Sequence, residues 1–345
     1  MNQSTEKKLE KLELLMERKH SLLIVLQNYP DPDAIASAAA LRELGHELAD
    51  LTCTIISGGF IGRSENRALM KYLDLPYHPE DNWPSEKADL VALVDTQPGT
   101  GNNILPLEYS ADIVIDHHPI KRETRSAEFH DVRNNYGATS TIMFEYLQAA
   151  EIQVSRQLAT GLLYGIRSDT QDLGRESSRA DIDAVVELYP LANKRMLAEI
   201  ANSKTPREYL AALQVALANA RIYGNAVVSN IGQSKIPEAV SEAADTLLRL
   251  EDIEWSFCSV ATGKKLLFSI RTCNPEYNSG DVATAICKDL GAGGGHQSMA
   301  GGIIDLSQTK RRSIERTTKE VEKRFLNQVK QTHRGIPLCG NDKCK

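Results

Sequence analysis

The sequence predicts an α/β protein with two domains and a helical connection between them. In the first half, near-continuous apolar segments alternate with helix-like segments, which is typical of a mainly parallel sheet flanked by helices. Residues 138–222 then read as consecutive helices, and strand-like segments return after residue 225. A length of 345 residues suits two domains.

The first half supplies the elements of a larger domain. Apolar runs predict strands at 21–27, 51–57, 89–95 and 112–118. Helices are expected at 33–45, where Gly45 is a plausible C-cap, and at 64–73, with Ser64 as N-cap.

The second half supplies a smaller α/β domain. Strands are expected at 225–231, 254–261, 265–271 and 300–306, and helices at 281–291 and 308–330. Residues 291–296, GAGGGH, read as a glycine loop. The expected organisation is an N-terminal helix (1–19), a first domain (20–190), a helical linker (191–221), a second domain (222–330) and a disordered tail (331–345).

Composition narrows the class of protein. The net charge of −6, from 40 Lys and Arg against 46 Asp and Glu, argues against a broad basic face for duplex DNA but allows a short nucleic acid. No apolar run reaches the length of a membrane span, and the charged N-terminus lacks a signal-peptide core, so we expect a cytoplasmic protein without a membrane partner. The six cysteines form no C-x-x-C pair, which favours reduced thiols.

Acidic and histidine residues gather where predicted strands end. These positions are Asp31 and Asp33, then Asp95, then Asp116, His117 and His118, with Asp169 closing a helix. Ligands of open α/β sheets bind outside the carboxyl ends of the strands, so these groups should converge. Carboxylates packed together need a cation, and oxygen ligands with imidazoles suit Mn²⁺ or Mg²⁺. Two ions sharing Asp95 would form a centre that activates water for phosphoryl displacement.

Each motif alone has a simpler interpretation. Asp33 could cap a helix beginning at Ala34, Asp95 could be a turn residue, and Asp116-His117-His118 could be a satisfied strand end. Their joint occurrence at three strand ends favours the shared site.

The motifs NYPDPDAIAS, ALVDTQ, VIDHHP and GIRSDT, in this order, resemble those of the DHH phosphoesterase superfamily. GGGHQSMAGG resembles the signature of the DHH-associated second domain, and the closest subgroup looks like the bifunctional oligoribonucleases and pAp phosphatases (nanoRNases). The resemblance implies an active site in the interdomain cleft. It also implies hydrolysis of short RNA or DNA oligonucleotides or small phosphorylated nucleotides, and it is compatible with a homodimer.

The resemblance also assigns residues to two Mn²⁺ ions, with Mg²⁺ as the alternative. Asp31 and Asp95 would bind the first ion, and Asp33, Asp95, His117 and Asp169 the second. His118 would face the substrate phosphate, and Asp116 would orient a histidine or the neighbouring backbone. This chain has Gln27 where the family has a histidine, so Gln27 is a further, weaker candidate ligand.

The second domain would bind the substrate. Gly293, Gly294, Gly295 and His296 match the family's substrate loop, and Arg271 matches an arginine that grips a phosphate. A flexible loop and a solvated strand-end arginine are the simpler interpretations. No Lys-Ser/Thr follows the glycines, which argues against a P-loop NTPase.

Two other functions stay open. One is a cyclic- or linear-dinucleotide phosphodiesterase. The other is a non-catalytic, nucleotide-binding regulatory protein, since Gln27 would weaken the first metal site.

Overall fold

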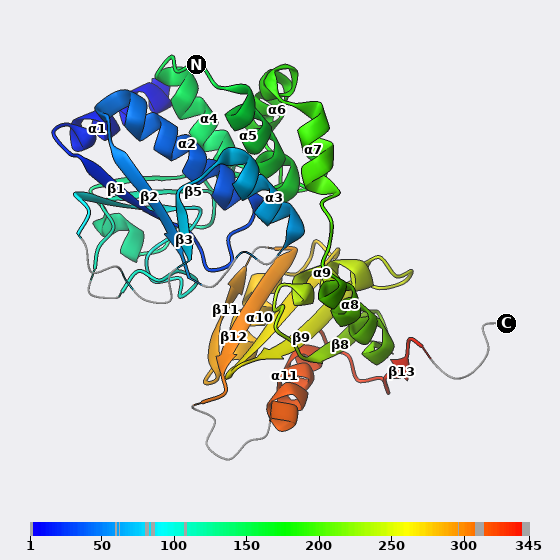
Figure 1. Ribbon diagram of the computed structural model, residues 1–345. Helices are drawn as coiled ribbons and strands as arrows, with labels where there is room; N and C mark the ends of the chain where they lie inside the picture. Colours follow the sequence, from blue (N-terminus) through cyan, green and yellow to red (C-terminus); the bar gives the residue numbers. More distant parts are fainter. Residues whose placement is uncertain are drawn as a thin grey trace. The chain divides into compact units, whose positions relative to one another are not determined.

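The computed structural model describes residues 3–58, 61, 63–79, 83, 87–106, 109–295, 297–307 and 314–339. Contacts divide the chain into two compact α/β units, residues 1–204 and 205–345 (Figure 1). The division falls within the predicted helical linker. The domain limits expected from the sequence remain predictions.

The N-terminal unit contains a six-stranded sheet in which every neighbouring pair is parallel. Its strands are β1 (Ser21–Val25), β2 (Thr52–Ser57), β3 (Tyr77–Pro79), β4 (Leu90–Val94), β5 (Ile113–Asp116) and β6 (Phe129–Val132). The order β3-β2-β1-β4-β5-β6 places β1 beside β4 at the point where the winding of the sheet reverses. Chains leaving the carboxyl ends of β1 and β4 therefore diverge and leave room for a site.

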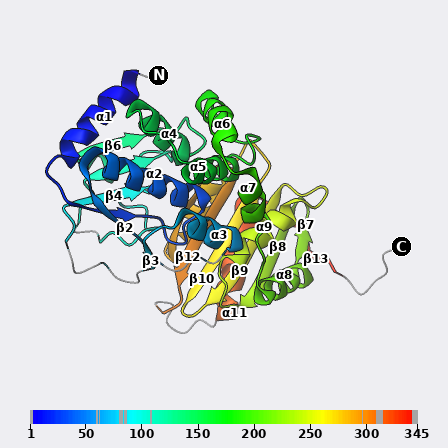
Figure 2. The same ribbon diagram turned by 45° about the horizontal axis from the view of Figure 1, so that its top comes forward.

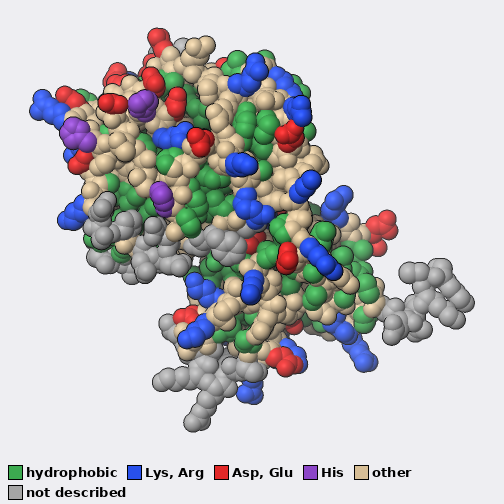
Figure 3. Space-filling view, in the orientation of Figure 1, with side chains coloured by type: hydrophobic (Ala, Val, Ile, Leu, Met, Phe, Trp, Pro, Cys, Tyr) green, Lys and Arg blue, Asp and Glu red, His purple; other side chains and the backbone are tan. Residues whose placement is uncertain are grey.

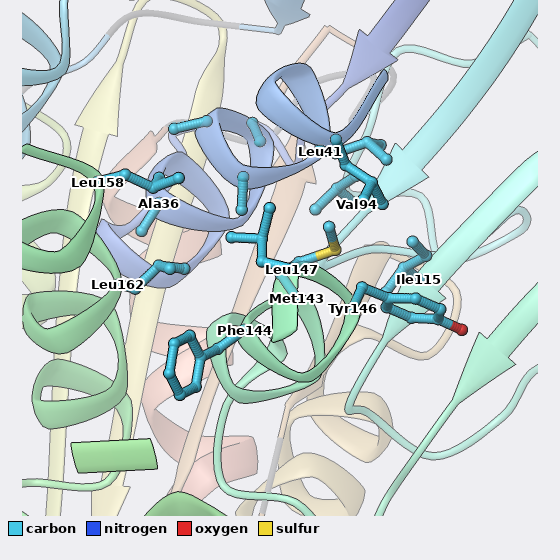
Figure 4. Close-up of a cluster of buried hydrophobic side chains, with 14 of the residues drawn as sticks. Ala36, Leu41, Val94, Ile115, Met143, Phe144, Tyr146, Leu147, Leu158 and Leu162 are labelled. Atoms are coloured by element: carbon cyan, nitrogen blue, oxygen red, sulfur yellow. The ribbon is translucent and has the colours of Figure 1, made fainter. Parts of the chain in front are cut away.

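Helices cover one face of this sheet (Figures 1 and 2). They are α1 (Gln3–Met16), α2 (Pro32–Ala49), α3 (Ser64–Leu73), α4 (Thr139–Ala149), α5 (Arg156–Asp169), α6 (Arg179–Leu191) and α7 (Lys194–Ala201). Side chains of α2, α4 and α5 meet Val94 and Ile115 of the sheet in a shared core (Figure 4). The other face of the sheet packs against loop residues such as Ile104 and Leu105.

Small residues let the helices next to the site approach closely. Alanines fill the buried face of α2. A Cβ at Gly165 of α5 would lie 2.5 Å from Ser140 Oγ and 3.2 Å from Asp33 Cα. Gly165 therefore fixes how near α5 comes to the beginnings of α2 and α4.

The predicted helix ends need correction. Gly45 lies inside α2, which continues to Ala49 and ends at Asp50 in the left-handed conformation, with φ of 51°. The N-cap of α3 is Arg63, without a side-chain cap, and Ser64 is the first helical residue. The sequence did not reveal β3 and β6, because β3 has three residues and β6 alternates buried and more exposed positions.

The C-terminal unit contains a seven-stranded mixed sheet of order β11-β12-β10-β9-β8-β7-β13. Its strands are β7 (Arg221–Tyr223), β8 (Ala226–Gln233), β9 (Trp255–Thr262), β10 (Lys265–Thr272), β11 (Gly291–Gly295), β12 (Met299–Asp305) and β13 (Ile336–Pro337). Among the described strands of this second sheet, only β8 and β9 pair in parallel.

Helices cover both faces of this second sheet. On one side, α8 (Arg207–Asn219) and α9 (Ala239–Leu248) enclose a small core that includes Val227. On the other side, α10 (Ser279–Cys287) and α11 (Ile314–Gln328) cover the core built on Phe257 and Phe268.

Two segments differ from the sequence expectation. The predicted glycine loop is the edge strand β11, which pairs antiparallel with β12. The predicted disordered tail is partly ordered, since Ile336 and Pro337 pair with β7.

Some properties of the described residues can be compared with the composition. In the described part of the chain, no helix is long and apolar enough to cross a membrane. Its five cysteines are all free thiols, whereas Cys344 lies outside the described residues. Basic and acidic side chains are interspersed on the face shown in Figure 3.

Candidate metal centre

The loop after β1 brings two carboxylates to the beginning of α2. Asp31 is the N-cap, and its Oδ1 accepts the backbone N–H of Ala34 at 3.0 Å. Asp33 is therefore not the cap. Its carboxylate, 0% exposed, instead accepts the N–H groups of Thr139 and Ser140 at 2.7 and 2.8 Å. The N-terminus of α4 thus holds the Asp33 carboxylate in place.

The end of β4 places Asp95 beside these groups. Asp95 has φ of 58°, and its N–H donates to Ile115 O at 3.0 Å, so its backbone turns sharply while still bonded to β5. Its side chain is 1% exposed, and Oδ1 accepts the Thr139 hydroxyl at 2.9 Å. One helix N-terminus therefore positions both Asp33 and Asp95.

His117 joins the carboxylates from β4 and α5. Its Nε2 lies 3.1 Å from Asp169 Oδ2 and 3.6 Å from Asp95 Oδ1. Its Nδ1 lies 3.2 Å from Tyr136 O, and a carbonyl oxygen can only accept, so Nδ1 carries a proton. In the neutral ring this tautomer directs the Nε2 lone pair at the acidic cluster, which is how histidine binds metals.

Among the described residues, two overlapping groups of side chains have ligand atoms close enough to hold an ion. They are Asp33, His117 and Asp169, and Asp95, His117 and His118, each within 4.8 Å. The structure thus brings together Asp33, Asp95, His117 and Asp169, the residues predicted for one ion.

The electrostatics of this cluster indicate a shortage of positive charge. Burial and, to a smaller extent, the carboxylate of Asp169 raise the pKa of Asp31. The same two causes raise the pKa of Asp33 to about 7. Burial and the carboxylates of Asp31 and Asp33 raise the pKa of Asp95 well above its usual value. Burial alone would lower the pKa of His117, but the surrounding carboxylates raise it well above the ordinary value. The residues therefore fit one or more divalent cations.

His118 and Asp116 form a second pair next to the cluster. His118 Nδ1 lies 2.7 Å from Asp116 Oδ1, and the His118 side chain is 28% exposed, so it can meet a substrate. Burial would raise the pKa of Asp116, but both histidines and the amide of Gln97 hold it far below its usual range.

Gln27 presents a donor and not a ligand oxygen. Its side-chain nitrogen lies 2.9 Å from Asp31 Oδ2 and 3.4 Å from Asp95 Oδ2. In both contacts the amide N–H₂ donates and a carboxylate oxygen accepts. One Asp31 oxygen therefore accepts a hydrogen bond from the beginning of α2, and the other accepts one from Gln27.

The residues predicted to bind substrate belong to the C-terminal unit. Arg271 on β10 is 7% exposed, and Nε donates to Asp245 Oδ1 of α9 at 2.5 Å, so it is not a solvated strand-end arginine. Gly293, Gly294 and Gly295 lie on β11, and His296 lies outside the described residues. Their substrate roles and the interdomain location of the site stay predictions.

Several residues that support the centre were not among those predicted from the sequence. They are Tyr136, Thr139 and Ser140, described above, and Gln97, which is buried and donates to Asp116. Thr139 and Ser140 open a helix after Gly137, a pattern that could have signalled carboxylate binding at a helix N-terminus.

Residues 21–166 match the DHH family, N-terminal domain, and residues 224–331 match the DHHA1 domain. The chain therefore belongs to the DHH superfamily of phosphoesterases, in the branch that carries a C-terminal DHHA1 domain. The resemblance to the superfamily and to its associated second domain is confirmed, whereas the nanoRNase subgroup stays a prediction.

Two curated relatives come from Methanocaldococcus jannaschii. Uncharacterized protein MJ1633 is 36% identical over 301 residues, which cover 87% of this chain and 60% of that protein. Uncharacterized protein MJ0988 is 24% identical over an alignment that covers 94% of this chain and 99% of that protein. The chain thus spans about 60% of the first relative.

Two solved structures share the fold. An exopolyphosphatase-related protein of Bacteroides fragilis has a TM-score of 0.65 at 16% identity, covering 93% of this chain and 96% of that one. RecJ of Thermus thermophilus in complex with Mn²⁺ has a TM-score of 0.51 at 14% identity, covering 94% and 55%.

Proposed function

We propose that this protein is a divalent-metal-dependent phosphoesterase that hydrolyses short oligonucleotides or small phosphorylated nucleotides. The observation that carries the proposal is the convergence of Asp33, Asp95, His117 and Asp169 beside the carboxyl ends of β1, β4 and β5. Membership of the DHH superfamily supports phosphoester chemistry at this place.

Asp33, Asp95, His117 and Asp169 would hold one ion, and Asp31 with Asp95 a second. A set of carboxylates with one imidazole suits Mn²⁺, with Mg²⁺ as the alternative, and the RecJ structure that shares this fold contains Mn²⁺. When bound, such ions supply Lewis acidity and a water of lowered pKa.

The protein's own groups would orient the substrate. His118 is the partly exposed imidazole at the edge of the cluster, so its ring would contact a phosphoryl oxygen and stabilise developing negative charge. Asp116 would keep His118 in the Nδ1-protonated tautomer.

The substrate would be short. Aromatic residues make up 6% of the chain, which argues against a long channel of stacked bases. Arg271, the β11 glycines and His296 would bind the far end of the nucleotide, with Arg271 held ready by Asp245.

Gln27 favours a second candidate, a non-catalytic protein that binds nucleotides for regulation. Its amide nitrogen contacts both Asp31 and Asp95, where a first ion would need a ligand oxygen. The two candidates differ in turnover.

A panel assay with Mn²⁺ separates them. The panel holds pAp, RNAs of increasing length, linear and cyclic dinucleotides and pyrophosphate. We expect hydrolysis of the shortest nucleotides, lost in His117→Ala and kept in Asp183→Asn, a control at an exposed carboxylate of α6. Binding without turnover of any substrate would favour the regulatory candidate and overturn the enzymatic one.

A further inference from the structure

Gln97 lies two residues after Asp95 and is 0% exposed. Its side-chain nitrogen donates to Asp116 Oδ2 at 2.5 Å and to Pro119 O at 3.2 Å. Its oxygen accepts Lys121 N at 2.8 Å and the Thr124 hydroxyl at 2.7 Å. One buried amide thus joins the end of β4 to the segment after β5.

Asp116 connects this amide to the partly exposed His118. Its Oδ2 accepts a hydrogen bond from the Gln97 side-chain nitrogen. Its Oδ1 accepts hydrogen bonds from His118 Nδ1 at 2.7 Å and from the backbone N–H of His117 at 2.8 Å. Asp116 is 1% exposed, so water does not replace a lost donor easily. With donors on both oxygens, the carboxylate has a single favourable orientation.

We propose that Gln97 is a positioning residue for His118 and acts through Asp116. The inference rests on the proposed function, because His118 matters for catalysis only if it meets the substrate. Without the Gln97 donor, the Asp116 carboxylate can turn about its Cβ–Cγ bond, and the hydrogen bond that orients His118 loses its fixed direction.

The two ends of the amide allow this role to be separated from a structural one. Thr124 contacts only the oxygen end, in the short 3₁₀ helix η1 (Glu123–Ser126). Thr124→Val therefore disturbs the loop anchor and leaves the Asp116 contact. Gln97→Glu keeps an acceptor for Lys121 and Thr124, and as a carboxylate it has no donor for Asp116, Pro119 O or His118 O.

The activity test compares these variants with the metal content measured in parallel. We expect Gln97→Glu and Gln97→Leu to lower kcat about 10- to 100-fold, the usual range for a group that supports a metal-centre residue. Bound metal should be unchanged, and Thr124→Val should stay near wild type. In an Asp116→Ala background, Gln97→Leu should cause no further loss, since residues acting in series are not additive.

Additive losses in that double variant, or an equal loss in Thr124→Val, would overturn the proposal. Lost metal in Gln97→Glu would also contradict it.

A second measurement is independent of turnover. In the metal-free protein, ¹⁵N NMR of the His118 ring should report the Nδ1-protonated tautomer in wild type and Thr124→Val, and a mixture in Gln97→Glu. An unchanged tautomer in Gln97→Glu would reject the inference even if the wild type hydrolyses no phosphoester, while a failed substrate panel alone would reject only the proposed function.

Discussion

Once divalent metal has been removed, the protein should lose stability as the pH rises from about 5 to about 8. Burial and the carboxylate of Asp169 raise the pKa of Asp33 to about 7, from 3.8. Between these values the unfolded chain has lost a proton that the folded chain keeps, so rising pH favours unfolding. The pKa difference of about 3 corresponds to about 4 kcal/mol in all, of which about 3 kcal/mol, or roughly 10 °C in Tm for a unit of this size, is lost between pH 5 and pH 8.

His117 and Asp116 do not reverse this loss of stability with rising pH. The pKa of His117 is raised, so its stabilising contribution is complete below 6.5 and is lost as the pH rises through its folded pKa. The pKa of Asp116 is lowered, so its contribution is complete above 3.8 and changes only in more acidic solution. Above about pH 5 the centre therefore loses stability.

Thermal melts of chelator-treated protein across this pH range, with and without Mn²⁺, measure the effect. Mn²⁺ should stabilise most at high pH, by about 2.7 kcal/mol at a hundredfold excess over Kd, because it binds ionised carboxylates. Asp33→Asn should flatten the pH dependence, whereas the exposed control Asp183→Asn should not. A chelated wild type equally stable at both ends of the range would refute the reasoning.

Four further predictions concern single substitutions. Asp95→Ala should abolish turnover and most metal binding, because Asp95 is the predicted ligand of both ions; retained metal in elemental analysis would contradict this. Gln27→His should tighten the weaker Mn²⁺ site roughly tenfold; an unchanged titration calorimetry isotherm would identify Gln27 as a bystander. Gly165→Ala should destabilise by about 1–3 kcal/mol, since its Cβ would lie 2.5 Å from Ser140 Oγ; an unchanged Tm would show that the helices adjust. Arg271→Ala should raise KM at unchanged metal content, and loss of metal would disprove a substrate role.

The location of the centre could be predicted because it depends on strand ends. Asp33, Asp95 and His117 follow apolar runs, and a parallel sheet brings the ends of neighbouring strands to one edge. The order β1-β4-β5 makes these three strands adjacent.

The supporting groups could not be predicted because their partners are distant in sequence. Asp33 is held by N–H groups of α4, more than 100 residues away, and Arg271 by Asp245 on another element. The donor role of Gln27 depends on nearby Asp31 and also on Asp95, which is 68 residues away.

The glycine segment shows a different limit. Glycine disfavours strands, so GAGGG reads as a loop. In the structure, a Cβ at Gly293 would lie 2.7 Å from Ala283 O and from Cys287 Sγ, so close packing of β11 on α10 requires glycine there. A tertiary contact therefore overrides the local preference.

The most direct test of the central claim is metal add-back with a single short substrate. Hydrolysis of pAp or a dinucleotide is followed for protein stripped by a chelator, then for the same sample after Mn²⁺ is restored. Turnover should disappear on stripping and return with Mn²⁺ in wild type but not in His117→Ala. Full-rate hydrolysis by the stripped protein, or none after Mn²⁺ saturation, would contradict it.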